Sequence, residues 1–104
     1  MKDTLFKGTK VKYRIEIESP GFDMAEDDFK IILKRGTYSE TYPKANLIDR
    51  EVGDKHEYYL AFDTTPFGPG DIIVTVEAYV PDEDFDGGIR TEIDRFRLVN
   101  VQPV

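Results

Sequence analysis

The chain has 104 residues, among them 21 acidic and 14 basic side chains, one histidine and no cysteine, and its formal net charge at pH 7 is −7. This length and a 39% share of hydrophobic residues suit one ordered domain with one core. The excess of acid disfavours nucleic acid and anionic membranes as partners, and the lack of cysteine excludes disulfides and thiolate zinc sites.

The N-terminal residues do not resemble a signal peptide, because charged side chains interrupt every apolar run. No stretch approaches the ~20 apolar residues that cross a bilayer. We therefore expect a single domain over residues 1–104 that resides in the cytoplasm.

The first predicted strand covers residues 10–18, where apolar and charged side chains alternate with the period of a half-buried strand. Its charged face carries a basic stripe, Lys10, Lys12 and Arg14. Such a stripe would either dock on an acidic surface of a neighbouring copy or block unwanted edge pairing. In the loop that follows, Asp23 and Glu26 have the spacing of a capping box, which predicts one helical turn.

A hairpin is predicted next along the chain. Residues 29–34 alternate again, and Arg35-Gly36 predicts a tight turn into a short strand at residues 37–42. Residues 44–55 mix a few apolar side chains with many charged ones, so we predict a surface connection there with at most one helical turn.

The second half of the chain contains three further predicted strands, at residues 57–62, 71–80 and 89–98. The middle one is apolar on both faces at its start, which is typical of a central strand. Before it, Pro69-Gly70 suits a type II turn. A change of phase in the last strand predicts a β-bulge near Asp94-Arg95.

These strands, the turn signals between them and the near absence of helical periodicity predict an all-β fold, an antiparallel sandwich of two sheets. An open barrel is the structural alternative. The Cys…Trp…Cys core of antibody domains is absent, because the sequence contains neither residue.

The loop after the predicted central strand contains a candidate metal site. Asp82, Asp84 and Asp86 alternate and precede Gly87, as in the first half of an EF-hand calcium loop. The twelfth position, where a bidentate Glu completes the shell, holds Ile93. We therefore weigh a calcium site at the three aspartates against a solvated acidic turn and favour the turn. No other cofactor is expected.

Two loops concentrate the acid, residues 23–28 and residues 82–86. If the sandwich places both loops at one end, they form a negative pole that attracts a cation or a basic partner surface. A solvated charged surface is the commoner use of such a run.

No constellation of residues predicts an enzyme. His56 lies between Lys55 and Glu57 at a strand entrance without a recognisable nucleophile, and nothing selects a catalytic pair among the carboxylates. Exposed tyrosines would suit an interface or a sugar-binding surface. The tyrosines considered for this are Tyr38, Tyr42, Tyr58 and Tyr79.

Short phrases along the chain are similar to those of small proteins encoded among phage and prophage structural genes. They are Phe6-Lys7-Gly8, YYLAFD at residues 58–63, AYVPDEDF at residues 78–85 and RTE at residues 90–92. The strand layout also resembles the N-terminal immunoglobulin-like domain of phage baseplate upper proteins. The resemblance implies an immunoglobulin-like antiparallel β-sandwich of about six to seven strands. It also implies a virion component of the tail, baseplate or neck that assembles through contacts with other protein subunits, copies of itself included.

The function expected from these observations is that of a non-enzymatic structural or adaptor domain. A small calcium- or carbohydrate-binding module is the alternative. A hydrolase built on an unrecognised pair of acids ranks behind both.

Overall fold

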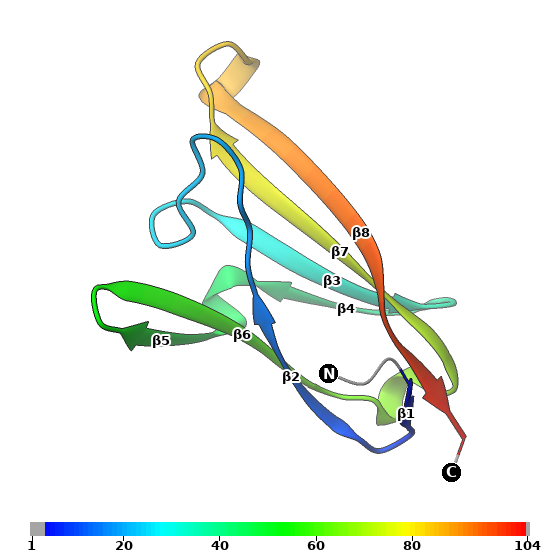
Figure 1. Ribbon diagram of the computed structural model, residues 1–104. Coiled ribbons are helices and arrows are strands. Elements are labelled where there is room, and N and C mark those ends of the chain that lie inside the picture. Colours follow the sequence, from blue (N-terminus) through cyan, green and yellow to red (C-terminus); the bar gives the residue numbers. More distant parts are fainter. Residues whose placement is uncertain (1–3, 104) are drawn as a thin grey trace.

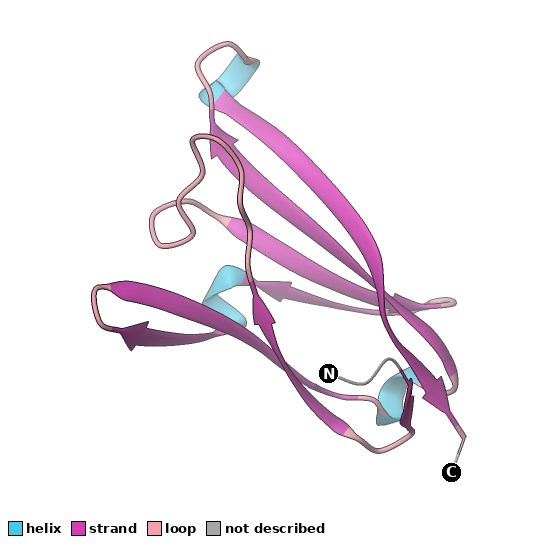
Figure 2. Ribbon diagram, viewed as in Figure 1, coloured by secondary structure: helices cyan, strands magenta, loops and turns pink. Residues whose placement is uncertain are grey.

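The protein is built almost entirely from β-strands, and the computed structural model describes residues 4–103 (Figure 1). In chain order the strands are β1 (Thr4–Phe6), β2 (Lys10–Ile15), β3 (Phe29–Arg35), β4 (Tyr38–Pro43), β5 (Ile48–Val52), β6 (Lys55–Asp63), β7 (Gly70–Pro81) and β8 (Ile89–Gln102). Short 3-10 turns lie in the connections, drawn in cyan in Figure 2: η1 (Lys44–Asn46), η2 (Thr65–Phe67) and η3 (Asp86–Gly88). No helix within residues 4–103 is long and apolar enough to cross a membrane.

The strands form two sheets, one of five strands in the order β1-β8-β7-β3-β4 and one of three strands in the order β2-β6-β5. The predicted all-β class is therefore confirmed. Neighbouring strands are antiparallel except β1 and β8, which run parallel from Thr4 beside Asn100 to Phe6 beside Gln102. The expectation of purely antiparallel sheets is wrong for this pair. β1 and β8 are neighbours in the sheet but far apart in the chain, so no hairpin forces them to run in opposite directions.

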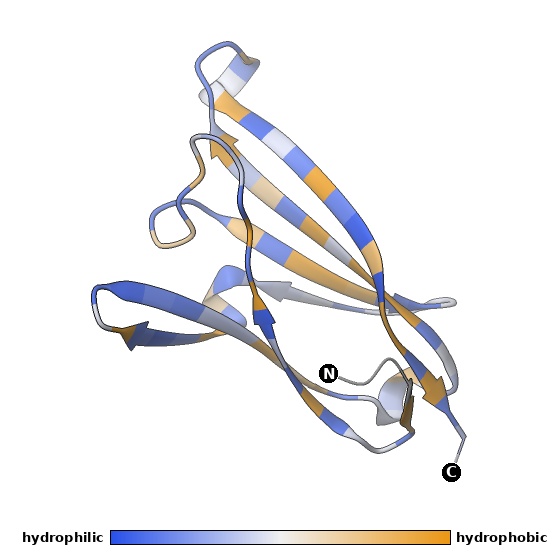
Figure 3. Cartoon of the chain, viewed as in Figure 1, coloured by the Kyte–Doolittle hydropathy of each residue, from blue (hydrophilic) through white to orange (hydrophobic). Residues whose placement is uncertain are grey.

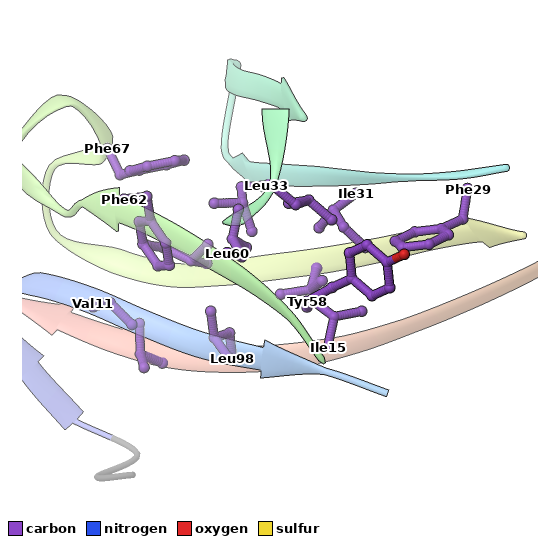
Figure 4. Close-up of a cluster of buried hydrophobic side chains, with 14 of the residues drawn as sticks. Val11, Ile15, Phe29, Ile31, Leu33, Tyr58, Leu60, Phe62, Phe67 and Leu98 are labelled. Carbon is purple, nitrogen blue, oxygen red and sulfur yellow. The ribbon is translucent and has the colours of Figure 1, made fainter. Parts of the chain in front are cut away.

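The two sheets enclose an apolar core between their inner faces (Figure 4). Side chains alternate along a strand, so β3 sends Phe29, Ile31 and Leu33 inward, and all three are fully buried. From the facing sheet, Tyr58 meets Phe29 edge to face with ring centroids 5.6 Å apart. This arrangement suits the charge distribution of aromatic rings and holds β6 against β3.

The predicted hairpin turn and central strand are present, and the predicted β-bulge lies at a different residue. Gly36 turns the hairpin between β3 and β4 with a φ of +59°, in the left-handed region that favours glycine. β7 pairs with β3 on one side and β8 on the other, so its central position is confirmed. The β-bulge lies farther along β8 than predicted: Ile72 pairs with Val99 and Ile73 with Arg97, which leaves Leu98 as the extra residue.

Two strands, β1 and β5, are not predicted from the sequence, and with them the described residues contain eight strands. β5 lies at a sheet edge within the segment predicted to be a surface connection, and only Ile48 of its residues is half-buried. It therefore lacks the apolar alternation that marks a strand. β1 has three residues, too few to show a period.

The loop at residues 23–28 forms a turn and no helix. The N–H of Ala25 donates to Asp23 Oδ1 at 2.9 Å, as an Asx turn does. The reciprocal contact comes from Asp27, whose Oδ2 accepts the N–H of Asp23 at 2.8 Å, and not from Glu26 as the capping-box spacing predicts. The carbonyl of Asp23 also accepts the N–H groups of Glu26 and Asp27, at 3.2 and 2.8 Å, so the single helical turn predicted here is present and is not continued into a helix.

Phe67 fills the end of the core nearest the β6–β7 connection, and substituting it tests the assigned packing. It is fully buried, and its ring meets those of Tyr38 and Phe62 edge to face at centroid distances of 5.1 and 5.8 Å. Phe67→Ala leaves a cavity, so we expect the free energy of unfolding in urea to fall by about 3–5 kcal/mol. Phe85 is 51% exposed, so the control Phe85→Ala should change it by less than about 0.5 kcal/mol. Equal losses in the two variants would contradict this core.

Candidate functional site

The two acidic loops lie together at one end of the molecule, which we term the acidic end (residues 23–28 and residues 82–86). The backbone N–H of Tyr79 donates to the carbonyl of Asp28 at 3.0 Å. Arg90 Nη2 donates to the carbonyl of Pro20 at 3.1 Å. Figure 1 shows the loop after β2 beside the tip of the β7–β8 hairpin, in the upper part of the view. The topology therefore produces the negative pole considered from the sequence.

Arg90 lies at the base of the hairpin tip and neutralises part of the acidic end. Its Nη1 donates to Asp82 Oδ2, and its Nε donates to Glu92 Oε1 at 3.2 Å. The other oxygen of Asp82 accepts the N–H of Asp84 at 3.0 Å. The hydrogen bond to Asp82 raises the pKa of Arg90, so the tip contains a fixed cation among its carboxylates.

The three predicted calcium ligands, Asp82, Asp84 and Asp86, lie on this tip without converging on one point. Within residues 4–103, no group of three or more His, Cys, Asp or Glu side chains is placed to hold a metal ion. Both oxygens of Asp82 are engaged by Arg90 and by the backbone. Ile93, at the twelfth position of the motif, is 54% exposed on β8. The calcium site stays a prediction from the sequence.

His56 lies beside the β5–β6 turn and contacts carboxylates. Its Nδ1 lies 2.7 Å from Asp49 Oδ1, and its Nε2 lies 3.7 Å from Glu51 Oε1. The imidazole also stacks on the ring of Tyr58 with centroids 6.3 Å apart. The hydrogen bond with Asp49 raises the pKa of His56. The histidine therefore links β6 to the edge strand β5 as an ion-pairing residue.

The tyrosines considered for a binding surface do not share an exposed face. Tyr58 is buried, because its position on β6 points it into the core. Tyr42 and Tyr79 are half-buried. Glu40 accepts hydrogen bonds from the hydroxyls of both Tyr38 and Tyr42, and burial raises the pKa of Tyr42. These residues lie two apart on one strand face, a spacing from which the pairing could be anticipated.

The basic stripe is exposed on β2, but two of its three cations, Lys12 and Arg14, are engaged by neighbouring side chains. Lys12 Nζ lies 4.7 Å from the centre of the Tyr59 ring. Arg14 lies 3.0 Å from a carboxylate oxygen of Glu16 and 3.2 Å from one of Glu57. Because these contacts already engage two of the cations, the basic stripe is less suited to bind an acidic partner.

An exposed apolar row lies on the outer side of the five-stranded sheet, and no sequence motif points to it. Ile73, Ile89 and Ile93 are 37%, 43% and 54% exposed. Strand register places them on one side of the β7–β8 hairpin, opposite to the buried face. Figure 3 shows the resulting alternation of apolar and polar bands along β8. We term this side of the five-stranded sheet the outer face.

The outer face is basic, although the chain as a whole is acidic. Register places on it the cations Lys30, Lys34, Arg95 and Arg97 and the carboxylates Asp71 and Glu77. Lys30 pairs with Glu77 at 3.1 Å, and Arg97 lies 3.9 Å from Asp71. Among residues 4–103, Lys34 and Arg95 have no salt-bridge partner. Positive charge therefore remains beside the isoleucine row.

No family model, curated protein or solved structure matches the chain. Its function is therefore inferred from the surfaces described above.

A calcium titration followed by calorimetry tests the motif at the hairpin tip. We expect no saturable heat, because Arg90 neutralises Asp82 and Ile93 supplies no oxygen ligand for the ion. A saturable heat that disappears in Asp84→Ala and persists in the control Glu51→Ala would establish the calcium site instead.

The pKa of His56 should lie above its usual value of about 6.5, because of the hydrogen bond with Asp49. An NMR titration of the imidazole should show this pKa falling in Asp49→Asn. Since the folded-state pKa is raised, the contact stabilises the fold fully below the unfolded-state pKa, and this contribution is lost as the pH rises through the folded-state pKa. A wild-type pKa at or below the usual value would contradict the contact.

Proposed function

We propose that this chain is a non-enzymatic structural or adaptor domain that acts through protein–protein contacts, as an assembly component of the tail, baseplate or neck of a phage or prophage virion. The observation that carries the proposal is the outer face, where isoleucines stand exposed between cations. A sheet face that contacts only water normally carries polar side chains. Apolar side chains grouped on one exposed face are typical of an interaction site.

The outer face suits an acidic protein surface that has an apolar centre. Contact with the isoleucines would supply affinity, and Lys34 and Arg95 would favour partners of negative charge. The acidic end of another copy offers such charge, so head-to-face self-assembly belongs to the proposal. Two outer faces would not meet each other, because their positive charges oppose one another.

The strand order supports an immunoglobulin-like β-sandwich. With β2 to β8 lettered B, C, C′, D, E, F and G, the small sheet has the order B-E-D and the large sheet contains the order G-F-C-C′. This is the arrangement of immunoglobulin domains in which C′ joins the G-F-C sheet. The virion setting is proposed from the short phrases of the sequence alone, and no matched protein supplies it.

Ile93→Glu and Val52→Glu form a matched pair of variants that test the docking surface. Ile93 lies on the outer face and Val52 on β5 of the other sheet, and the two side chains are 54% and 53% exposed. In a pull-down from a lysate that contains phage particles, wild type and Val52→Glu should retain the same tail, baseplate or neck protein. Ile93→Glu should retain less than about a tenth as much, because it buries a charge in the interface.

Light scattering over a wide range of protein concentration tests self-assembly in parallel. Oligomers that Ile93→Glu disperses and Val52→Glu preserves would support the head-to-face contact. A monomer at every concentration, together with no virion partner in the pull-down, would overturn the proposed function. Equal retention by both variants would contradict docking through the outer face.

A further inference from the structure

A second surface, which shares only Ile93 with the outer face, lies where edges of the two sheets face each other. β2 is an edge strand of the small sheet, and β8 pairs with β1 only at residues 100–102. Within the described chain, residues 89–99 of β8 therefore pair with β7 on one side alone. Such an edge presents a row of N–H and C=O groups to which another strand can pair.

A groove separates this edge from β2 and from the residues that continue β2. Two adjoining hollows of about 600 and 470 Å³ share Glu16, Val76 and Phe96 in their walls. We term them together the β2–β8 groove. Its apolar lining comes from both sheets and from the segment after β2: Ile15, Ile17, Val76, Ala78 and Phe96. The groove thus reaches the margin of the core.

Carboxylates line both walls of the groove. They are Glu16 and Glu18 after β2, and Glu92 and Asp94 on β8. The two on β8 belong to the inner side of the sheet, because they pair with Ala78 and Val76. Arg14 and Arg90 engage Glu16 and Glu92, whereas Glu18 and Asp94 have no salt-bridge partner among residues 4–103. Lys12 and Arg14 lie in the wall of the first hollow, so the negative charge is concentrated in the second hollow, beside β8.

We propose that the β2–β8 groove accepts an extended segment of a partner protein in which lysine or arginine alternates with apolar residues, and that this segment adds a strand to the free edge of β8. The inference rests on the proposed function as an interaction domain and defines a second docking mode. Backbone hydrogen bonds to β8 supply affinity, and alternate side chains supply selectivity.

The two faces of the added strand meet different surroundings. Its inward side chains are cationic: their aliphatic stems lie along Val76 and Phe96, and their charges reach Glu92 and Asp94. Its outward side chains are apolar and extend the row that includes Ile93. The alternation required of the partner follows from the period of two of a strand.

A second copy of this chain, paired edge to edge, fits the groove less well. Two-fold pairing of β8 with itself would set Glu92 and Asp94 of one copy beside the same carboxylates of the other. Like charges on opposed strand positions destabilise the pair. Inward-pointing charges on an edge strand are a defence against such self-pairing, but they favour a cationic strand.

NMR titration of the isotope-labelled full chain with synthetic peptides tests the proposal. A peptide that alternates lysine with valine should give saturable shifts of the amides of residues 89–97 and residues 12–18. A peptide that alternates glutamate with valine should bind at least about tenfold more weakly, because the groove is negative beside β8. The lysine peptide methylated on its backbone nitrogens should lose affinity to the same degree, because it cannot pair with β8.

Matched variants test whether the preference for a cationic peptide arises from the carboxylates on β8. Glu92→Lys combined with Asp94→Lys should weaken binding of the lysine peptide about tenfold or more, because attractive pairs become repulsive. Glu51→Lys makes the same kind of change at a side chain that is 77% exposed on β5, and should alter binding less than about twofold. The comparison of the lysine and glutamate peptides uses the wild-type chain, so it tests the charge preference of the groove even if the double variant does not fold.

Absence of saturable shifts, shifts confined to other strands, or equal affinity for the lysine and glutamate peptides would overturn the proposal. Dimerisation of the free protein through the same β8 amides would also overturn it, in favour of a second copy. None of these results bears on the outer face, which is tested against virion proteins. Because Ile93 also lines the groove, Ile73→Glu, which lies on the outer face alone, separates the two surfaces.

Discussion

The surfaces of this protein depend on one constraint, the incomplete pairing of β8. One edge of β8 pairs with β7 along almost its whole length, whereas the other edge pairs with β1 only at residues 100–102. β7 and β8 have 12 and 14 residues, and only six residues of β3 pair with β7. The hairpin therefore extends beyond its neighbours. Its outer side, its free edge and its tip reach solvent together, and they carry the isoleucine row, the inward carboxylates and the acidic turn respectively.

Charge is sorted among these surfaces and not spread evenly over the molecule. The outer face has more cations than carboxylates, whereas the acidic end and the β2–β8 groove are negative. The net charge of −7 thus conceals a basic face. Two surfaces of opposite sign on one hairpin would select different partners, since electrostatic complementarity governs which surfaces can approach. Arg90 limits the repulsion among the acids by joining the hairpin tip to the loop after β2.

The sequence predicts the strands that bury one face, because burial imposes the period of two that alternation reveals. Edge strand β5 has a single half-buried residue and leaves no such trace. The bulge at Leu98 depends on how β8 follows β7, so the phase change alone misplaces it. The acid of the two loops is visible in the sequence, but their proximity requires the strand order. Ile89 and Ile93 alternate as a buried face would, and only the fold shows that this face is exposed.

Residue-by-residue amide hydrogen exchange on the dilute protein tests the free edge of β8 most directly. Over residues 89–97, amides directed at β7 should exchange slowly and the alternate amides directed away from it should exchange fast. Residues 100 and 101, which pair with both β1 and β7, should be protected without alternation. Uniformly slow exchange over residues 89–97 would show that the edge is already covered, and would contradict the free edge on which docking in the β2–β8 groove depends.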